Sequence, residues 1–219
     1  MTRIKICGIR GKAHALAAAE AGADFIGLVF APSPRQVTLS QAERIAAAVK
    51  QSNYATEVVG LFVNTSATVV NQIAGACHLD WVQLSGDESW EYCAEINRPL
   101  IKVVHVSRQQ SPQEICALLA DGAKILANQK HVYLLDAKVK GKYGGTGKPF
   151  NWGLAQQIAE QFPVIIAGGL TPENVVQAIK IVVPWGVDVS SGVEVGGSKH
   201  VARIRAFIRA VRRCDENQR

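Results

Sequence analysis

Residues 163–170, PVIIAGGL, run on into TPEN at 171–174 and carry the strongest structural signal in the chain. The apolar part suits a buried parallel strand, and the two glycines would let the backbone come close to a ligand before a helix begins. Residues 186–192, GVDVSSG, repeat this pattern with hydroxyls and a glycine after a second apolar run. Two such strand ends predict the phosphate site that (β/α)8 barrels form after strands 7 and 8. The candidate phosphate-binding residues are Gly168, Gly169, Ser190, Ser191 and Gly192.

The rest of the chain alternates between strand-like and helix-like patterns. Apolar runs bounded by turn residues predict eight strands, at residues 4–9, 24–30, 58–64, 81–85, 100–106, 132–137, 164–168 and 187–190. The segments between and after them predict eight helices, at residues 13–21, 40–50, 67–76, 89–96, 112–119, 152–161, 172–180 and 200–213. Most of the predicted strands are continuously hydrophobic, which is typical of strands covered on both faces. A doubly wound sheet usually has about five or six strands, so the pattern favours a (β/α)8 TIM barrel.

Length and composition favour one globular domain over residues 1–219. Hydrophobic residues make up 48% and charged residues 19%, which excludes disordered and fibrous classes. No run approaches the roughly 18 apolar residues of a membrane span, and the first residues show no signal-peptide core. We therefore expect a cytoplasmic protein without a membrane partner. The five cysteines are scattered, without metal-binding spacing, so we expect reduced thiols and no metal site.

The formal net charge of +6 raises the question of a nucleic-acid partner. Much of it comes from residues 200–219, the last predicted helix and the residues after it, which contain arginines at 203, 205, 209, 212, 213 and 219. Apolar residues of the same helix form a separate stripe, and cations near a helix C-terminus are favoured by the helix dipole. We interpret these arginines as a solvated helix face and expect no nucleic-acid partner.

Barrels place their chemistry at the carboxyl ends of their strands, so polar residues there are the candidate functional groups. A lone thiol beside a glycine is often an inert buried group, but Cys7 follows the first strand opposite the phosphate loops. Asp136 ends an apolar run, where a carboxylate is costly unless it is paired or used. We predict that Cys7 and Asp136 are catalytic. Other polar residues at strand ends are Ser33, Asn64, Gln83, Ser85 and Asp87.

Arg35 lies in the sequence APSPRQV, in a loop stiffened by Pro32 and Pro34. A planar guanidinium suits a substrate carboxylate, and the alternative is a surface arginine that pairs with a nearby acid. We predict that Arg35 binds substrate. His105 on the fifth strand is interpreted as a hydrogen-bonded histidine of the core or rim rather than a general base.

A long glycine-rich segment, KVKGKYGGTGKPF at 138–150, follows the sixth strand. Such a segment is uncommon in a compact domain unless it closes over a ligand or is disordered. Its GGTGK does not form a nucleotide-binding P-loop, because Pro149 follows Lys148 where that motif requires Ser or Thr.

Many short segments in this order resemble phosphoribosylanthranilate isomerase, a family of tryptophan biosynthesis. They are KICGI, GLVFAPSPRQV, GLFVN, VQLSGDE, IKVV, LLDAK followed by GGTGKPFNW, IIAGGLTPENV and GVDVSSGVE. The resemblance covers nearly the whole chain and implies a (β/α)8 barrel that acts on a phosphosugar without metal or cofactor. It implies that Cys7 is the general base, Asp136 the general acid and Arg35 the contact to the anthranilate carboxylate, with the phosphate on the AGGL and SSG loops.

Two positions depart from the pattern of that family. The family usually has His where this chain has Ser85, and a Lys-Asp pair where it has Lys199 and His200. Neither departure touches the predicted acid and base. Both a monomer and a homodimer are compatible with the resemblance.

Three rival functions were weighed against this one. Indole-glycerol-phosphate synthase would need a lysine acid on a barrel strand, and a ribulose-phosphate epimerase would need metal ligands; we expect neither from the sequence. A non-catalytic phosphate-binding barrel would keep the glycine loops but would not need Cys7 and Asp136 together.

Overall fold

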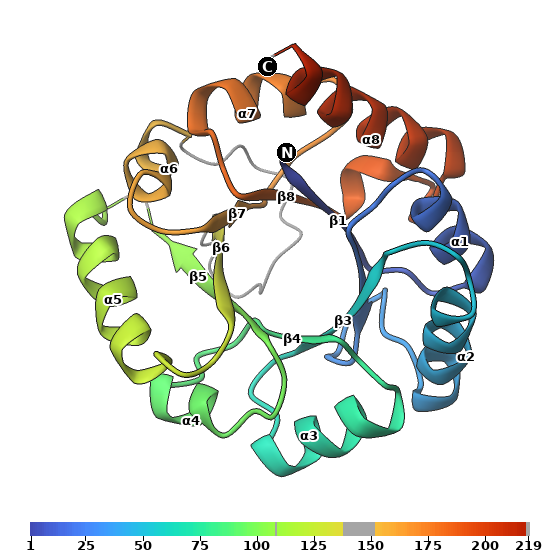
Figure 1. Ribbon diagram of the computed structural model, residues 1–219, viewed down its shortest axis with the longest axis horizontal. Helices are drawn as coiled ribbons and strands as arrows, with labels where there is room; N and C mark the ends of the chain where they lie inside the picture. The colour runs from blue at the N-terminus through green and yellow to red at the C-terminus, as the bar shows by residue number, and fades with distance from the viewer. Residues whose placement is uncertain (108, 138–151, 218–219) are drawn as a thin grey trace.

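The computed structural model describes residues 1–107, 109–137 and 152–217. Eight parallel strands hydrogen-bond in chain order, and the last pairs with the first, so the sheet closes into a barrel (Figure 1). This confirms the predicted TIM barrel. The strands are β1 Arg3–Cys7, β2 Phe25–Val29, β3 Glu57–Phe62, β4 Trp81–Leu84, β5 Leu100–Val106, β6 His131–Ala137, β7 Val164–Ile166 and β8 Gly186–Val189. The predicted glycine-rich segment at 138–150 lies outside the described residues.

Helices surround this ring on the outside (Figure 1). They are α1 Lys12–Glu20, α2 Leu39–Lys50, α3 Ala67–Ala76, α4 Trp90–Ala94, α5 Pro112–Ile125, α6 Trp152–Ala159, α7 Val175–Val182 and α8 Val201–Glu216. A single 3-10 turn, η1 Ser191–Val193, and a short hairpin of β9 Glu194–Val195 with β10 Ser198–Lys199 lie between β8 and α8. None of the helices in the described ranges has the length and apolar character of a membrane span.

Alternation along each strand divides the core into two layers. Residues such as Ile4 and Ile6 face outward and pack with the helices in the larger apolar cluster. The alternate residues face inward, where a smaller cluster fills the barrel with Phe25, Val59, Trp81, Ile101, Val103, Val132, Leu134, Ile165 and Ala167. Because successive side chains of a strand point to opposite faces, the residues that follow this inner cluster are aimed at the carboxyl end of the barrel.

Two aspartates lie at the amino-terminal end of the barrel strands. Asp24 comes directly before β2 and accepts a hydrogen bond from the backbone N–H of Ile4 at 2.9 Å, while Asp80, directly before β4, accepts one from Val58 at 2.8 Å. Each carboxylate therefore satisfies a donor of the preceding strand in the ring, and each also pairs with a basic side chain, Arg212 and Lys50 respectively.

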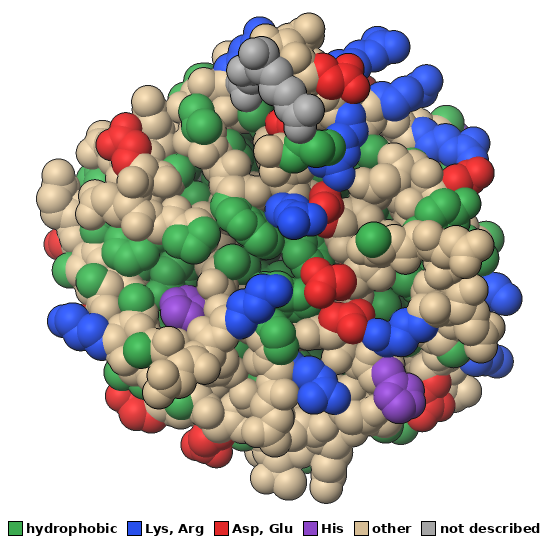
Figure 2. Space-filling model, in the orientation of Figure 1, with side chains coloured by type: hydrophobic (Ala, Val, Ile, Leu, Met, Phe, Trp, Pro, Cys, Tyr) green, Lys and Arg blue, Asp and Glu red, His purple; other side chains and the backbone are tan. Residues whose placement is uncertain are grey.

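Arginines of α8 pair with acids of the neighbouring elements. Arg205 contacts Glu20 of α1 at 2.7 Å, and Arg212 contacts Asp24 at 2.8 Å. Figure 2 shows basic and acidic side chains together along the edge that α8 and α1 form. These arginines thus attach α8 to its neighbours, as expected for a solvated and paired helix face.

The structure corrects several predicted boundaries. The helix predicted at 112–119 continues to Ile125, because Gly122 lies inside it against the ring of Trp90 instead of ending it. The helix predicted at 172–180 begins only at Val175, because the Asn174 side chain holds a turn by accepting from Thr171 N and donating to Gly169 O. The sequence analysis did not predict η1 or the β9–β10 hairpin.

Two helix glycines give a matched pair of substitutions. A Cβ at Gly122 in α5 would lie 2.7 Å from the Trp90 ring, so Gly122→Ala should lower the free energy of unfolding by about 1–3 kcal/mol. A Cβ at Gly75 in α3 would meet nothing within 4 Å, so Gly75→Ala should raise it by about 0.4–1 kcal/mol. Urea unfolding followed by circular dichroism measures both. A gain in stability for Gly122→Ala would contradict the packing of α5 against Trp90.

Candidate active site

A cavity of about 800 Å³ opens at the carboxyl ends of the strands. All eight residues predicted as catalytic or substrate-binding line it: Cys7, Arg35, Asp136, Gly168, Gly169, Ser190, Ser191 and Gly192. Ser33, Asn64, Gln83, Ser85 and His105 also line it, whereas Asp87 is not among its lining residues. The loops and strand ends that the sequence analysis placed on one rim therefore surround one space.

Cys7 is the last residue of β1 and is 6% exposed. Its partner in the neighbouring strand is Gly27, and a Cβ at that glycine would lie only 3.0 Å from the Cys7 sulfur. The missing side chain thus leaves room for the thiol. Burial raises the pKa of Cys7, and the positive charge of Lys5 offsets part of this rise. This environment favours the thiol over the thiolate.

Asp136 lies on β6 and is 5% exposed. Its register partner on β5 is His105, which follows the inward-facing Val103 by two positions. The Nε2 atom of His105 lies 3.0 Å from the carbonyl oxygen of Ser85. The histidine therefore bridges from β5 to the end of β4, in agreement with its interpretation as a hydrogen-bonded rim residue.

Arg35 forms a two-pronged ion pair with Glu194 of β9. Its Nε donates to Oε1 at 2.7 Å and its Nη2 donates to Oε2 at 2.8 Å. Lys199 of β10 donates to the same Oε1 at 2.5 Å, and to the carbonyl oxygen of Ser190 at 2.9 Å. The alternative that Arg35 pairs with a nearby acid is thus observed, and the pair fixes the guanidinium in the cavity wall.

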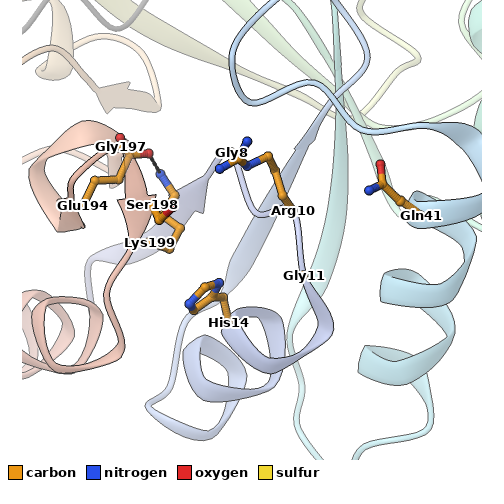
Figure 3. A pocket seen from close by; sticks show the side chains of 9 residues that line it. All are labelled: Gly8, Arg10, Gly11, His14, Gln41, Glu194, Gly197, Ser198 and Lys199. Carbon is orange, nitrogen blue, oxygen red and sulfur yellow. Dashed lines mark hydrogen bonds and ion pairs between the residues drawn. The ribbon is translucent and has the colours of Figure 1, made fainter.

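The ion-paired Glu194 and Lys199 also line a smaller hollow of about 310 Å³, together with Arg10 and His14 (Figure 3). Figure 3 shows the hairpin residues on one side of this hollow and the start of α1 on the other. The network of Arg35, Glu194 and Lys199 therefore separates the hollow from the larger cavity.

The loops after β7 and β8 are built around glycines. Gly168 and Gly169 have backbone φ values of +87° and +69°, which residues with a side chain rarely adopt. A Cβ at Gly192 would lie 1.9 Å from the carbonyl oxygen of Leu170, so the two loops touch through their backbones. After β8 the chain turns at once into η1, and a short extra helix at this place is a common part of barrel phosphate sites.

Two buried, ion-paired lysines on the barrel strands were not singled out in the sequence. Lys5 faces the barrel interior, whereas Lys102 lies between the inward-facing Ile101 and Val103 and so faces outward, and neither lines the cavity. Lys5 on β1 is 1% exposed and lies 3.0 Å from Asp188, and Lys102 on β5 is 5% exposed and lies 2.6 Å from Glu88. The signal was present in the sequence, since each lysine interrupts an apolar run. Glu194 was missed as well, because it lies in the hairpin that was not predicted.

Comparisons with known proteins agree with this geometry. The model of the N-(5'phosphoribosyl)anthranilate (PRA) isomerase family matches residues 4–210. The N-(5'-phosphoribosyl)anthranilate isomerase of Dehalococcoides mccartyi is 46% identical over 218 residues, which cover 100% of this chain and 99% of that relative.

The chain belongs to the phosphoribosylanthranilate isomerase family.

Solved isomerase structures have the same fold. The crystal structure of phosphoribosyl anthranilate isomerase from Thermotoga maritima matches with a TM-score of 0.80 and 36% identity, over 97% of this chain and 99% of the other. Another phosphoribosyl anthranilate isomerase, in complex with reduced 1-(o-carboxyphenylamino)-1-deoxyribulose 5-phosphate, matches with a TM-score of 0.77 and 34% identity, with the same coverage. The resemblance seen in the sequence motifs is thus confirmed at the level of the family.

Glu194, which pairs with Arg35 of the cavity wall, should make the stability of the protein depend on pH. Burial raises the pKa of its carboxyl, but hydrogen bonds from Arg35 and Lys199 outweigh burial and lower that pKa below 4.5. The stability that its charge contributes is therefore present above pH 4.5 and is lost as the pH falls through the lowered value. Glu194→Gln should lower the Tm at neutral pH, and the difference from wild type should shrink in acid.

Thermal unfolding at several pH values measures this difference. Glu20→Gln is the control, because its ion pair with Arg205 is exposed and should contribute little. A Tm difference for Glu194→Gln that stays constant with pH would mean that the charge of Glu194 does not stabilise the fold.

Proposed function

We propose that Cys7 and Asp136 carry out the acid–base chemistry of the isomerase reaction in this chain. The reaction is the Amadori rearrangement of N-(5-phospho-β-D-ribosyl)anthranilate to 1-(2-carboxyphenylamino)-1-deoxy-D-ribulose 5-phosphate. Asp136 protonates the ring oxygen of the furanose, the C1–O bond breaks, and the anthranilate nitrogen forms a Schiff base with C1. Cys7 then removes the proton from C2 to give an enolamine, which takes up a proton at C1 and loses the proton of its C2 hydroxyl to give the ketone of the product.

The observation that carries this proposal is that both groups line one cavity from different strands. Cys7 ends β1 and Asp136 lies near the end of β6, on different sides of the ring (Figure 1). An acid and a base so arranged can act on a bound sugar from different directions. Since burial raises the pKa of Cys7, the base becomes more available as the pH rises.

The same cavity supports an orientation for the substrate. We propose that the phosphate lies on the backbone of Gly168, Gly169 and Gly192 with the hydroxyls of Ser190 and Ser191, and that Arg35 contacts the anthranilate carboxylate. The bonds to Glu194 use Nε and Nη2, and among the described residues Nη1 makes no hydrogen bond. Nη1 would therefore be the atom that meets the carboxylate, with Glu194 holding the plane of the guanidinium.

The activity itself is tested by following the anthranilate fluorescence of the substrate with the purified protein. Loss of emission on conversion supports the isomerase, whereas retention of emission together with phosphate binding would favour a non-catalytic phosphate-binding barrel. The remaining expectations, one domain over residues 1–219, a cytoplasmic location and a monomer or homodimer, stay predictions.

Replacement of the two catalytic groups should slow the reaction without abolishing the fold. A positioned acid or base contributes about 10²- to 10⁴-fold in rate, so Cys7→Ser and Asp136→Asn should each lower kcat by at least about 10²-fold. Serine has nearly the size of cysteine but is a far weaker acid than a thiol with a pKa of about 8.5. Steady-state kinetics measures the loss, and Cys116→Ser on α5 is the control, with an expected kcat equal to wild type. A near-normal kcat for Cys7→Ser would exclude the thiolate as the base.

Removal of the Arg35 guanidinium should weaken binding of the substrate's carboxylate without weakening binding of its phosphate. Arg35→Ala should weaken product analogues that bear the anthranilate carboxylate by at least about tenfold, as expected for a lost charge-assisted hydrogen bond. Inorganic phosphate should bind nearly as before, because the proposed phosphate ligands are the loop backbone and the serine hydroxyls, and among the described residues Arg35 is hydrogen-bonded to Ser190 only indirectly, through Glu194 and Lys199. Isothermal titration calorimetry measures both ligands, with Arg44→Ala on the exposed face of α2 as control. Equal losses for both ligands would indicate that Arg35 maintains the cavity wall instead.

A further inference from the structure

The inner face of β1 carries a second ionisable group directly below Cys7. Lys5 precedes Cys7 by two residues, so both side chains point into the barrel, while Ile4 and Ile6 point outward. Lys5 is 1% exposed and does not line the cavity. It cannot touch substrate from this position, and the acid–base pair proposed above does not use it.

Asp188 holds the ammonium of Lys5 in the charged form. The two residues are register partners on β1 and β8, and Nζ lies 3.0 Å from Oδ1. Burial lowers the pKa of Lys5, but Asp188 and then Cys7 outweigh burial, so that the pKa is raised. A buried ammonium without such partners would lose its proton. Lys5 therefore keeps its positive charge inside the barrel at neutral pH.

The same ammonium lies close to Cys7. Gly27 of β2 faces both groups, and a Cβ at this glycine would lie 3.0 Å from the Cys7 sulfur and 3.1 Å from Lys5 Nζ. Burial raises the pKa of the Cys7 thiol, and the charge of Lys5 is the largest influence that lowers it. The Lys5 ammonium is thus ion-paired with a buried carboxylate and lies close to the thiol that must lose its proton.

Other charged groups act on Cys7 as well. Asp188 of β8 opposes ionisation of the thiol, while Lys199 of β10 favours it. Arg35 lies close enough to Cys7 for their charges to interact. Among these charged groups Lys5 has the largest electrostatic effect on the thiol.

We propose that Lys5 is a positioning residue for the reaction, whose buried ammonium, anchored by Asp188, stabilises the Cys7 thiolate. The inference rests on the proposed role of Cys7 as the base. Because Lys5 and Cys7 lie in the interior, salt screens the effect of the Lys5 ammonium on the Cys7 thiolate only weakly. Lys5 replaces part of the hydration that the thiolate loses at the bottom of the cavity.

The test compares the ionisation of Cys7 in matched variants. Lys5→Met/Asp188→Asn removes both buried charges and keeps side chains of similar size, so the core is not left with one unpaired ion. Lys102→Met/Glu88→Gln is the matched control, because it neutralises another buried ion pair of a strand lysine, on β5 across the ring (Figure 1). Each protein is labelled with cysteine enriched in ¹³Cβ, and the Cys7 signal is assigned by its loss in Cys7→Ala.

We expect Cys7 in Lys5→Met/Asp188→Asn to titrate at higher pH than in wild type, by less than the roughly one to three units that a single opposite charge contributes, because the opposing charge of Asp188 is removed as well. The rising limb of kcat against pH should move by the same amount, whereas the Cys7 titration of the control should match wild type. A variant in which Cys7 fails to ionise before unfolding, while wild type ionises, supports the same conclusion. Titration at the wild-type pH or below, or no ionisation of Cys7 in the folded wild type, would overturn the proposal.

A reciprocal measurement leaves Lys5 unchanged and so does not depend on the folding of the double variant. If Lys5 favours the Cys7 thiolate, the thiolate must favour the Lys5 ammonium by the same factor. In Cys7→Ala, one lysine signal of protein labelled with ¹³Cε-lysine should titrate at lower pH than in wild type, and unchanged lysine titrations would contradict the interaction. Near-normal kcat in Cys7→Ser would refute the base but leave both titration results standing.

Discussion

Closure of the barrel constrains which polar side chains can face inward. A closed sheet of parallel strands has no edge and encloses a space without bulk water, so an inward polar group must find a partner inside or reach the cavity. Along β1 this constraint separates Lys5, which is sealed inside and paired with Asp188, from Cys7, which reaches the cavity. On β5 the inward-facing His105 also lines the cavity, whereas Lys102 faces outward between Ile101 and Val103 and is buried with Glu88. On β1, depth along the inner face therefore separates a buried, ion-paired lysine from a group that reaches the cavity.

The sequence was sufficient for the strands because their apolar runs are local signals. The strand predicted at 100–106 agrees with β5 at both ends, and the others differ by a few residues at most. The helix ends were harder to predict, because they depend on distant or side-chain contacts. Gly122 breaks no helix since the Trp90 ring covers it, and α7 begins late since Asn174 holds the turn before it. Neither contact is visible in hydrophobic periodicity.

The candidate site could be predicted as far as strand ends determine it. Cys7, Asp136 and the glycine loops follow apolar runs, so the barrel topology alone brings them to one rim. The ionic partners could not be predicted, because Arg35 and Glu194 are 159 positions apart and Lys5 and Asp188 are 183 apart. Alternation along residues 3–7 does not reveal Lys5 as a buried group either, because an alternating strand normally turns its polar face to water, whereas here that face is the barrel interior.

The contact between Gly192 and Leu170 has a consequence for how barrels of this kind can be recombined. With no room for even a methyl group between the two backbones, the loops after β7 and β8 form a single rigid unit although α7 separates them in the chain. A transplant of one loop into another barrel would place its backbone against an unmatched neighbour. Fragments exchanged between barrels should therefore carry β7, α7 and β8 together, so that crossover points fall before β7 or after η1.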